Sequence, residues 1–297
     1  MANTHEHDHH HHSSSRNIRL AFFLNAGFAL LEIAGGLWTN SVAILSDALH
    51  DLGDSLSLGL AWMLDEVADK ERDERYSYGY KRFSLLGAFL NIVILFAGSI
   101  WVLTKSIPRL LHPEPVHASG MLLFAIVGIT INGLAAIRLK RDHSLNARVV
   151  ALHLLEDVLG WAAVLIVSIT LLFTKILILD ALLSIGITLF ILYNVIRNLK
   201  KTGQLFLQAI PEKIDTRMID EQILALKHVK STHHTHCWSL DGEHHVLSTH
   251  VVLEDGTTQE AIEQTKCDIR EIAIKLGFIH ITIETEFEGE HCSMPEK

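Results

Sequence analysis

Apolar residues along this chain gather into six long blocks, and the C-terminal third follows a different pattern. Each block approaches or exceeds the roughly 20 residues that a helix needs to cross a bilayer. Beyond residue 203 the apolar runs are short and alternate with polar residues, which is typical of a water-soluble domain. The pattern predicts six membrane spans, near residues 17–38, 42–64, 83–105, 116–138, 147–173 and 176–199.

The C-terminal third alternates between helical and strand-like periodicity. Two runs of alternating residues flank the turn Asp241-Gly242-Glu243, which is a hairpin signal. A later helical segment ends at Gly277, a residue favoured just after a helix. The predicted elements are a helix over 214–227, strands over 232–240 and 245–253, a helix over 258–276 and a strand over 279–287. The order αββαβ predicts a small α+β sandwich after an all-α membrane domain.

These patterns divide the chain into four parts. The first carries six histidines among its opening twelve residues, and it reads either as a native histidine-rich tract or as part of an expression tag. We predict a disordered tail over 1–15, a six-helix transmembrane domain over 16–203, a cytoplasmic metal-binding and dimerisation domain over 204–290, and a C-terminal tail over 291–297.

The distribution of charge indicates orientation and excludes one class of partner. Alternate connections, counted from the N-terminus, hold fourteen Lys and Arg, whereas the intervening connections hold three. Because basic loops stay in the cytoplasm, both termini are predicted to be cytoplasmic. From residue 203 onward seventeen acidic residues face eight basic ones, within a net charge of −9, so no nucleic-acid partner is expected. The three cysteines also lie there, in a reducing compartment.

One phrase occurs twice inside the apolar blocks. Residues 48–56 read ALHDLGDSL and residues 151–159 read ALHLLEDVL, so both fit A-L-H-x-L-x-D-x-L. Each copy puts a histidine and an aspartate at i and i+4, on one face of a helix. Ionisable residues are costly within a bilayer and are functional candidates by default.

The two copies together supply ligands for one divalent metal ion. His50, Asp54, His153 and Asp157 offer two imidazole nitrogens and two carboxylates, enough for a tetrahedral site. Two neutral imidazoles and two carboxylates carry a charge of −2, which a divalent cation cancels. Metal binding requires neutral imidazole and ionised carboxylate, so protons compete for the site and metal–proton exchange follows. The alternative is that each pair is a structural His–Asp hydrogen bond between helices.

Further carboxylates share the predicted spans with these pairs. Asp47 and Asp51 lie on the same helical strip as His50 and Asp54, and we treat Asp47 as an accessory candidate. Neither has an acidic match in the second copy of the phrase. Glu32 is a candidate proton relay or entry-path residue, although polar residues in spans more often bridge helices.

Six spans, H-x-x-x-D on spans 2 and 5 and a C-terminal αββαβ domain resemble the cation diffusion facilitators, in particular the zinc-transporting branch. The segments Ser41–Ala48 and Tyr78–Phe83 also match that family. The resemblance implies a homodimeric metal–proton antiporter of the bacterial inner (plasma) membrane, with His50, Asp54, His153 and Asp157 as transport site. It implies Zn²⁺, with Cd²⁺ often accepted, as cargo and protons as counter-ion, and a ferredoxin-like, metallochaperone-like cytoplasmic domain.

The same resemblance implies a regulatory zinc site in the cytoplasmic domain. Its ligands would be His233, His250 and Glu286, with His234, Glu284 and Cys292 as accessory candidates. A chance cluster of surface histidines is the alternative. Some members bind a further metal through histidines just before helix 3, but here Tyr76 and Tyr80 occupy those positions, so we expect no tight zinc site there.

Arg82 resembles the basic residue that pairs with an acid near the start of the cytoplasmic domain and locks the dimer. In this chain Leu207 and Gln208 lie where that acid is expected. Arg82 is therefore equally interpreted as a residue that anchors the protein in the membrane.

Two other functional classes compete with transport. An integral-membrane metal enzyme is disfavoured because the sequence has no H-E-x-x-H and only two histidines, His50 and His153, in the interior of the predicted spans. A metal sensor that binds zinc without moving it is the second alternative, and a flux measurement separates it from a transporter.

Overall fold

The computed structural model contains two compact units, which we describe separately. The first comprises the chain up to Glu66 together with Leu86–Leu199, and the second comprises Val67–Leu85 with Lys200–Lys297. The structure describes residues 11–68, 70, 72–139, 145–290 and 292.

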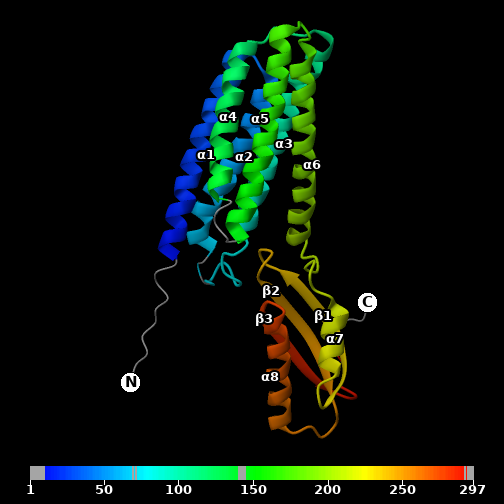
Figure 1. Cartoon of the computed structure of the whole chain (residues 1–297). Coiled ribbons are helices and arrows are strands. Elements are labelled where there is room, and N and C mark those ends of the chain that lie inside the picture. The colour runs from blue at the N-terminus through cyan, green and yellow to red at the C-terminus, as the bar shows by residue number, and fades with distance from the viewer. Residues whose placement is uncertain (1–10, 69, 71, 140–144, 291, 293–297) are drawn as a thin grey trace, which may run out of the picture. The chain divides into compact units, whose positions relative to one another are not determined.

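The first unit is formed by six long helices (Figure 1). Among the described residues, five of them are long and apolar enough to cross a membrane. The remaining one, α2, is 27 residues long but carries Asp47, Asp51 and Asp54 in its first half. The predicted helical membrane part is confirmed, and part of the candidate site lies on the acidic helix α2. The helices are α1 (His11–Thr39), α2 (Val42–Ala68), α3 (Phe83–Leu111), α4 (Ala118–Leu139), α5 (Leu145–Phe173) and α6 (Ile178–Phe206).

Two boundaries differ from the predicted ones. Helix α1 begins at His11, inside the predicted tail over 1–15, and residues 1–10 lie outside the described part. Serine has only a modest helix penalty, so an established helix can extend through the serine run at little cost. Helix α6 continues to Phe206, past the predicted boundary at 203, because Lys200–Leu205 holds several good helix formers.

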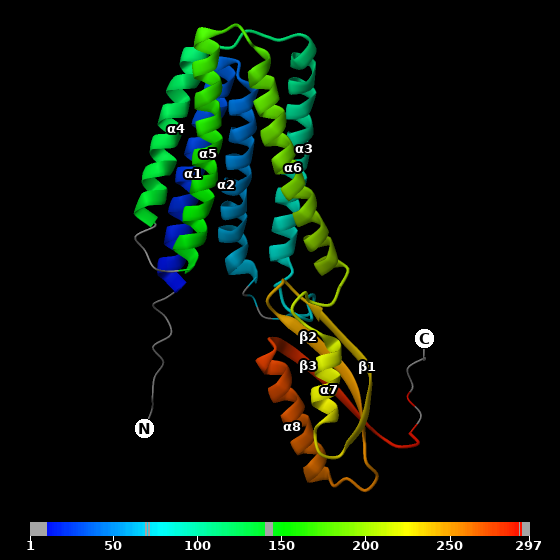
Figure 2. The same cartoon turned by 45° about the vertical axis from the view of Figure 1, so that its right-hand side comes forward.

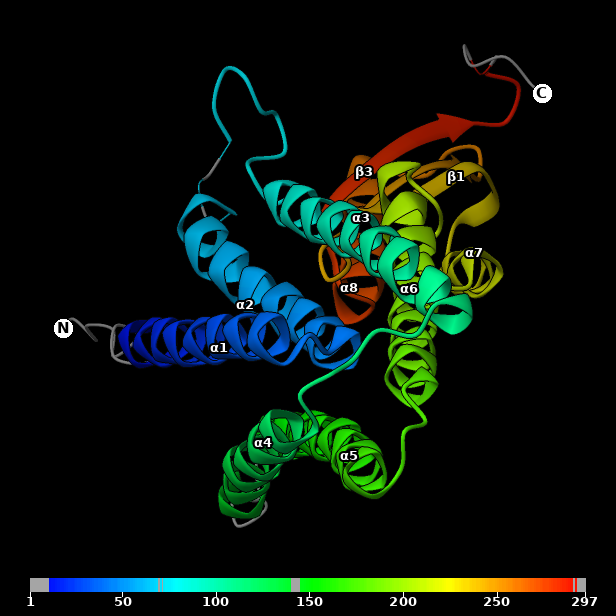
Figure 3. The same cartoon turned by 90° about the horizontal axis from the view of Figure 1, so that it is seen from above.

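The helices pack in pairs, which Figure 3 shows from above. The contacts within each pair are made by apolar side chains. Helices α4 and α5 lie side by side, and buried Met121, Ala125 and Trp161 belong to their shared core. Helices α3 and α6 meet through Ile92, Ile191 and Val195. The remaining apolar side chains, which are exposed in the isolated chain, cover the outside of the helices as a lipid-facing surface requires.

One buried carboxylate secures the start of α2. Asp180 on α6 is 1% exposed and accepts a hydrogen bond of 2.6 Å from the Ser41 hydroxyl. It also accepts bonds of 2.9 and 3.4 Å from the backbone N–H groups of Val42 and Ala43. These N–H groups have no partner within the helix, and an anion at a helix N-terminus is favourable. Asp180 therefore fixes the end of the helix that carries His50 and Asp54.

The second unit contains a three-stranded sheet in the order β1-β2-β3 (Figure 2). Strands β1 and β2 pair antiparallel, and β2 and β3 pair parallel, with helix α8 as the crossover between them. The observed order αββαβ confirms the predicted domain. The elements are α7 (Thr216–Leu224), β1 (Val229–Ser239), β2 (His245–Leu253), α8 (Gln259–Lys275) and β3 (Phe278–Phe287).

Both helices cover one face of this sheet. Ile223 on α7 and Ile269 on α8 are fully buried against Leu247, Val251 and Leu253 of the central strand. Asp215 caps α7 by accepting from the Arg217 N–H, and Thr258 caps α8 by accepting from the Ala261 N–H. Alternation along the strands puts His250 and Glu286, together with the apolar Trp238 and Val246, on the other face of the sheet.

The loop between α2 and α3 belongs to the second unit, which the sequence did not predict. The ring of Tyr78 contacts the ring of Trp238 on β1, with centroids 6.3 Å apart, and that of His280 on β3 at 5.2 Å. Asp73 organises the loop by accepting from the Tyr80 hydroxyl at 2.6 Å and from two backbone N–H groups. The Tyr80 hydrogen bond, together with those N–H groups, lowers the pKa of Asp73.

We expect Asp180→Asn to lower the free energy of unfolding by about 2 kcal/mol, because it weakens charge-assisted bonds to buried donors. Thermal unfolding of the purified protein in detergent measures this. Glu114→Gln is the matched control, because the exposed Arg109–Glu114 pair at 2.5 Å should contribute less than about 1 kcal/mol. Equal effects of the two substitutions would contradict the role assigned to Asp180.

Candidate functional site

The two copies of the repeated phrase face each other in the structure. His153 Nε2 of α5 lies 2.8 Å from Asp54 Oδ2 of α2, and His50 Nε2 lies 3.8 Å from the same oxygen. The two imidazole rings are edge to face, with centroids 5.7 Å apart. Asp54 therefore contacts both histidines, and each phrase contributes to one cluster between α2 and α5.

Asp157 completes this cluster from the same turn of α5 as His153. His50, His153 and Asp157 each offer one ligand atom, and these three atoms lie within 4.8 Å of one another. Zinc ligands lie about 2.0–2.1 Å from the ion, which puts tetrahedral ligand atoms about 3.3 Å apart. The three atoms need to move by only an ångström or so to reach this spacing. Asp54 is already within hydrogen-bonding distance of His153, a contact that a cation would replace.

The donor set and its charge both fit a divalent cation. Imidazole nitrogen and carboxylate oxygen are ordinary zinc ligands, and no thiolate is present in this cluster. Asp157 is only 8% exposed, so its ionised form needs a compensating positive charge. His50, Asp54 and His153 are partly exposed, which leaves a route for an ion to reach them. The arrangement can hold one divalent cation in exchange for protons.

Three more carboxylates are buried in the same helices. Asp47 and Asp51 on α2 are 6% and 5% exposed, and Glu32 on α1 is 1% exposed. The carboxyl groups of Glu32 and Asp51 lie close enough to interact directly. Asp47 lies against Gly160 of α5, where an added Cβ would be 3.4 Å from its carboxylate. Asp47 is not among the residues that the structure brings to ligand distance, so its accessory role stays a prediction.

A second cluster lies on the sheet of the second unit. His233 on β1 pairs directly with His250 on β2, and Glu286 lies on β3. Glu286 Oε1 is 2.7 Å from His250 Nδ1, and Glu286 Oε2 is 3.3 Å from His233 Nε2. Cys292, beyond the end of β3, has its Sγ 3.7 Å from His250 Nδ1. Ligand atoms from all four residues lie within 4.8 Å of one another.

The electrostatics of this second cluster favour an ionised carboxylate. Burial raises the pKa of Glu286, but the hydrogen bond to His250 and the nearby ring of His233 outweigh it and hold that pKa below its usual value. His250 and Glu286 are 5% and 8% exposed, whereas His233 and Cys292 are half-buried. Two imidazoles, a carboxylate and a thiol form a closed set of four ligands, as structural zinc sites have.

Of the three accessory candidates, Cys292 joins the cluster, whereas His234 and Glu284 lie near it. His234 has φ of +48° within an irregularity of β1, and its ring lies 5.5 Å from that of His250. Glu284 is 3.4 Å from His250 Nε2 but its side chain is 57% exposed. Arg82 makes no ion pair in the described part of this single chain, so its role in a dimer stays a prediction.

Sequence reasoning missed Asp180 as a residue that positions the first cluster. Its only signal was an isolated carboxylate between the apolar runs Ile176–Leu179 and Ala181–Leu183. Its partners lie 137 to 139 residues away, so no local pattern links them.

The chain was compared with known families and proteins. Residues 18–207 match the cation efflux transmembrane domain, and residues 211–288 match the cation efflux protein cytoplasmic domain. A cadmium, cobalt and zinc/H(+)-K(+) antiporter of Bacillus velezensis is 32% identical, covering 95% of this chain and 91% of that protein. The metal cation efflux system protein CzcD of Cupriavidus metallidurans is 31% identical, over 96% and 90%. The zinc transporter ZitB of Escherichia coli is 29% identical, over 100% and 97%.

Proposed function

This chain belongs to the cation efflux family, or cation diffusion facilitators, and we propose that it exports Zn²⁺ in exchange for protons through a four-ligand site in its membrane helices. It is a multi-pass membrane transporter for metal cations rather than an enzyme. Relatives named as zinc and cadmium transporters support Zn²⁺ as the main cargo and Cd²⁺ as an alternative.

The observation that carries the proposal is the convergence of α2 and α5. His50, His153 and Asp157 bring three ligand atoms within 4.8 Å, and Asp54 lies 2.8 Å from His153. A single polar pair in a span would serve equally as a helix–helix hydrogen bond. Two identical pairs that meet at one point favour an ion between them.

The exchange follows from the chemistry of these ligands. Zn²⁺ binds when both imidazoles are neutral and both carboxylates are ionised, and the filled site is then neutral overall. Protonation occupies the nitrogen lone pairs of the imidazoles and removes the negative charge of the carboxylates, and the ion is released. When the site opens to the side with more protons, protons displace Zn²⁺, and when it opens to the other side, it loses those protons and rebinds Zn²⁺. Asp180 keeps α2 in position through its N-terminus during this exchange.

The proposed orientation of the protein rests on the distribution of its basic residues. Fourteen of the seventeen Lys and Arg residues of the membrane part lie in connections assigned to the cytoplasm, which supports a cytoplasmic position for both termini. We propose a homodimer in the bacterial inner membrane, since bacterial relatives are similar over nearly the whole chain. The second unit is then the cytoplasmic domain.

We also propose that the cluster on the sheet binds regulatory Zn²⁺ in the cytoplasm. Its support is the approach of four ligand atoms from His233, His250, Glu286 and Cys292. A closed set of four ligands holds an ion in place and leaves no open position for exchange with a substrate, so this site suits sensing rather than transport.

Zinc flux into proteoliposomes is expected to fall to the background of empty vesicles in Asp157→Asn, because the substitution removes one ligand and the charge that neutralises the cation. Glu156→Gln is the matched control: it also removes a carboxylate from α5, but from an exposed position one residue away. Residual flux in Asp157→Asn equal to that of the control would refute the assignment.

His153→Asp should shift transport from Zn²⁺ toward Mn²⁺, because a hard oxygen replaces a borderline nitrogen. Competition of each metal for uptake measures this shift. An unchanged order of preference would mean that His153 is not a ligand.

A pH gradient that is acidic inside the vesicles should drive zinc uptake, with protons leaving as zinc enters. Collapsing the gradient with an ionophore should stop net accumulation, and a fluorescent pH indicator in the lumen should report alkalinisation when zinc is added. Accumulation that continues without any gradient would exclude antiport. A sensor without transport would bind zinc and show no flux in any of these conditions.

Cd²⁺ added to the full-length protein should produce the ultraviolet charge-transfer absorption of a thiolate–cadmium bond. We expect Cys292→Ser to abolish it. Cys267→Ser, which removes an exposed thiol on α8, is the control and should retain it. Burial raises the pKa of the Cys237 thiol, so that residue should stay protonated and not contribute. Loss of the signal in Cys267→Ser alone would overturn the assignment.

A further inference from the structure

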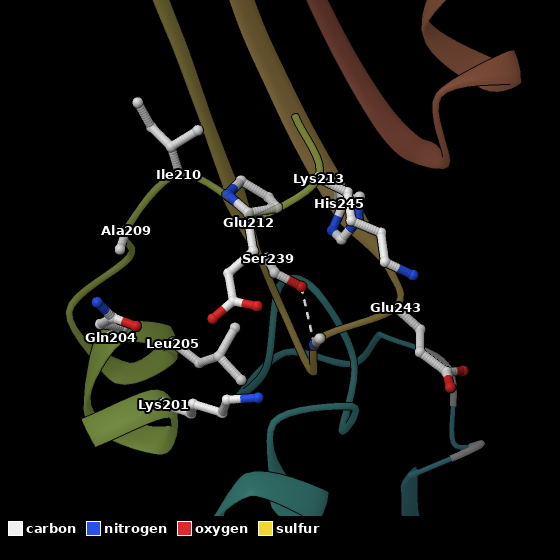
Figure 4. Close-up of a pocket in the computed structure, with 12 residues that line it drawn as sticks. Lys201, Gln204, Leu205, Ala209, Ile210, Glu212, Lys213, Ser239, Glu243 and His245 are labelled. Carbon is white, nitrogen blue, oxygen red and sulfur yellow. Dashed lines mark hydrogen bonds between the residues drawn. The ribbon is translucent and has the colours of Figure 1, made fainter. Parts of the chain in front are cut away.

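A polar cavity lies in the second unit where the last membrane helix meets the sheet. Its volume is about 460 Å³, within the range of small-ligand sites. One wall is the last turns of α6, with Lys201, Gln204 and Leu205, and the other is the turn between β1 and β2. Figure 4 shows Lys201 on the side of α6, Lys213, Glu243 and His245 across the cavity, and Glu212 between them.

The length of α6 places this cavity at the level of the lipid headgroups. A hydrocarbon core of about 30 Å uses about 20 residues of helix, which from Ile178 reaches Arg197. The remaining nine residues extend about 13 Å further, and they include the cavity residues Lys201 and Gln204. Basic residues commonly mark the point where a helix leaves the hydrocarbon core of the bilayer. Arg197 and Lys201 lie at this point of α6.

Four charged side chains line the cavity, two of each sign. Lys201 and Lys213 are cationic, and Glu212 and Glu243 are anionic. In the part of the chain that the structure describes, none of the four makes an ion pair. Burial lowers the pKa of His245, so its ring is neutral at pH 7 and the lining has no net charge. A ligand with one positive and one negative group matches this lining.

Apolar side chains beside the cavity are exposed to an unusual degree. Leu207 is 84% exposed and Ile210 is 54% exposed, in the segment that follows α6. The helix ends through Gln208, whose φ of +57° turns the chain, and the N–H groups of Leu207 and Ala209 satisfy carbonyls of the last turn. A lipid has acyl chains next to its headgroup. Exposed leucine and isoleucine side chains next to a charged cavity are therefore complementary to a lipid.

We propose that this cavity binds the headgroup of a phospholipid that carries a phosphate and a primary ammonium, as in phosphatidylethanolamine. The phosphate accepts hydrogen bonds from Lys201 and Lys213, and the ammonium donates to Glu212 and Glu243. The acyl chains contact Leu207 and Ile210. The inference rests on the membrane placement of α6 in the proposed function and not on transport itself.

The chemistry of the lining disfavours the other common headgroups. An anionic headgroup without an ammonium would leave Glu212 and Glu243 unpaired and repelled. A choline headgroup has no N–H to donate, and no aromatic side chain lines the cavity to bind a quaternary ammonium. The primary ammonium is the group that satisfies both carboxylates.

Native mass spectrometry of the delipidated full-length protein tests the proposal. Phosphatidylethanolamine, phosphatidylcholine and phosphatidylglycerol are added separately and bound lipid is counted. The wild type should prefer phosphatidylethanolamine. Glu212→Gln/Glu243→Gln should bind phosphatidylethanolamine about tenfold more weakly and should bind phosphatidylglycerol more tightly than the wild type, because the repulsion of the anionic headgroup is removed. Lys201→Gln/Lys213→Gln should lose affinity for both lipids.

Glu263→Gln/Lys266→Gln on α8 is the matched control and should bind like the wild type. If a double variant does not fold, Glu243→Gln on the exposed turn should shift the preference in the same direction. An unchanged preference in the carboxylate variants would overturn the proposal. Full displacement of the lipid by soluble glycerophosphoethanolamine would overturn the lipid assignment and indicate a cytosolic ligand. Because the readout is bound lipid, failure here leaves zinc flux unaffected, and the two proposals fail separately.

Discussion

A carboxylate inside a bilayer must be neutralised, and this requirement governs the membrane part of the chain. Helix α2 carries three aspartates and a histidine in its first half, more than an isolated span tolerates. Helix α2 packs so that His50 and Asp54 lie beside His153 of α5. There a positive charge, on an imidazole or on a bound ion, can compensate the negative charge of a carboxylate. In the proposed function, the same need for a compensating charge lets a divalent cation and protons replace one another in this cluster.

The surrounding structure supports that cluster from its two sides. Asp180 satisfies the N-terminal N–H groups of α2, and buried hydroxyls of Ser46, Ser184 and Thr188 link α2 to α6 at 2.7 to 3.1 Å. On the other side, the loop that follows α2 folds onto the sheet through Tyr78. The helix that bears the ligands is thus continuous with the unit that bears the second metal-ligand cluster.

Periodicity and spacing predicted much of this arrangement. Six apolar blocks, the αββαβ order and the residues of the cluster between α2 and α5 follow from local patterns, because helical and strand periods fix which side chains share a face. The candidates His233, His250 and Glu286 of the second cluster came from the resemblance to the family. Three features were not predicted from the sequence. Two depend on contacts between residues that are far apart in the sequence, and the third depends on the small free-energy cost of extending a helix. Asp180 binds Ser41 139 residues away, Tyr78 reaches a sheet formed far along the chain, and α1 starts at His11 through a low-cost extension. The irregularity that turns His234 is likewise invisible in the alternation of β1.

X-ray absorption at the zinc edge of purified protein tests the central claim most directly. In the Cys292→Ser/His250→Ala variant, which lacks two ligands of the cytoplasmic cluster, one bound zinc should remain, with four nitrogen and oxygen ligands at about 2.0 Å, two of them imidazoles. Adding Asp157→Asn should remove that zinc. A sulfur ligand, a six-oxygen shell or zinc that persists after Asp157→Asn would show that the ion does not bind between α2 and α5.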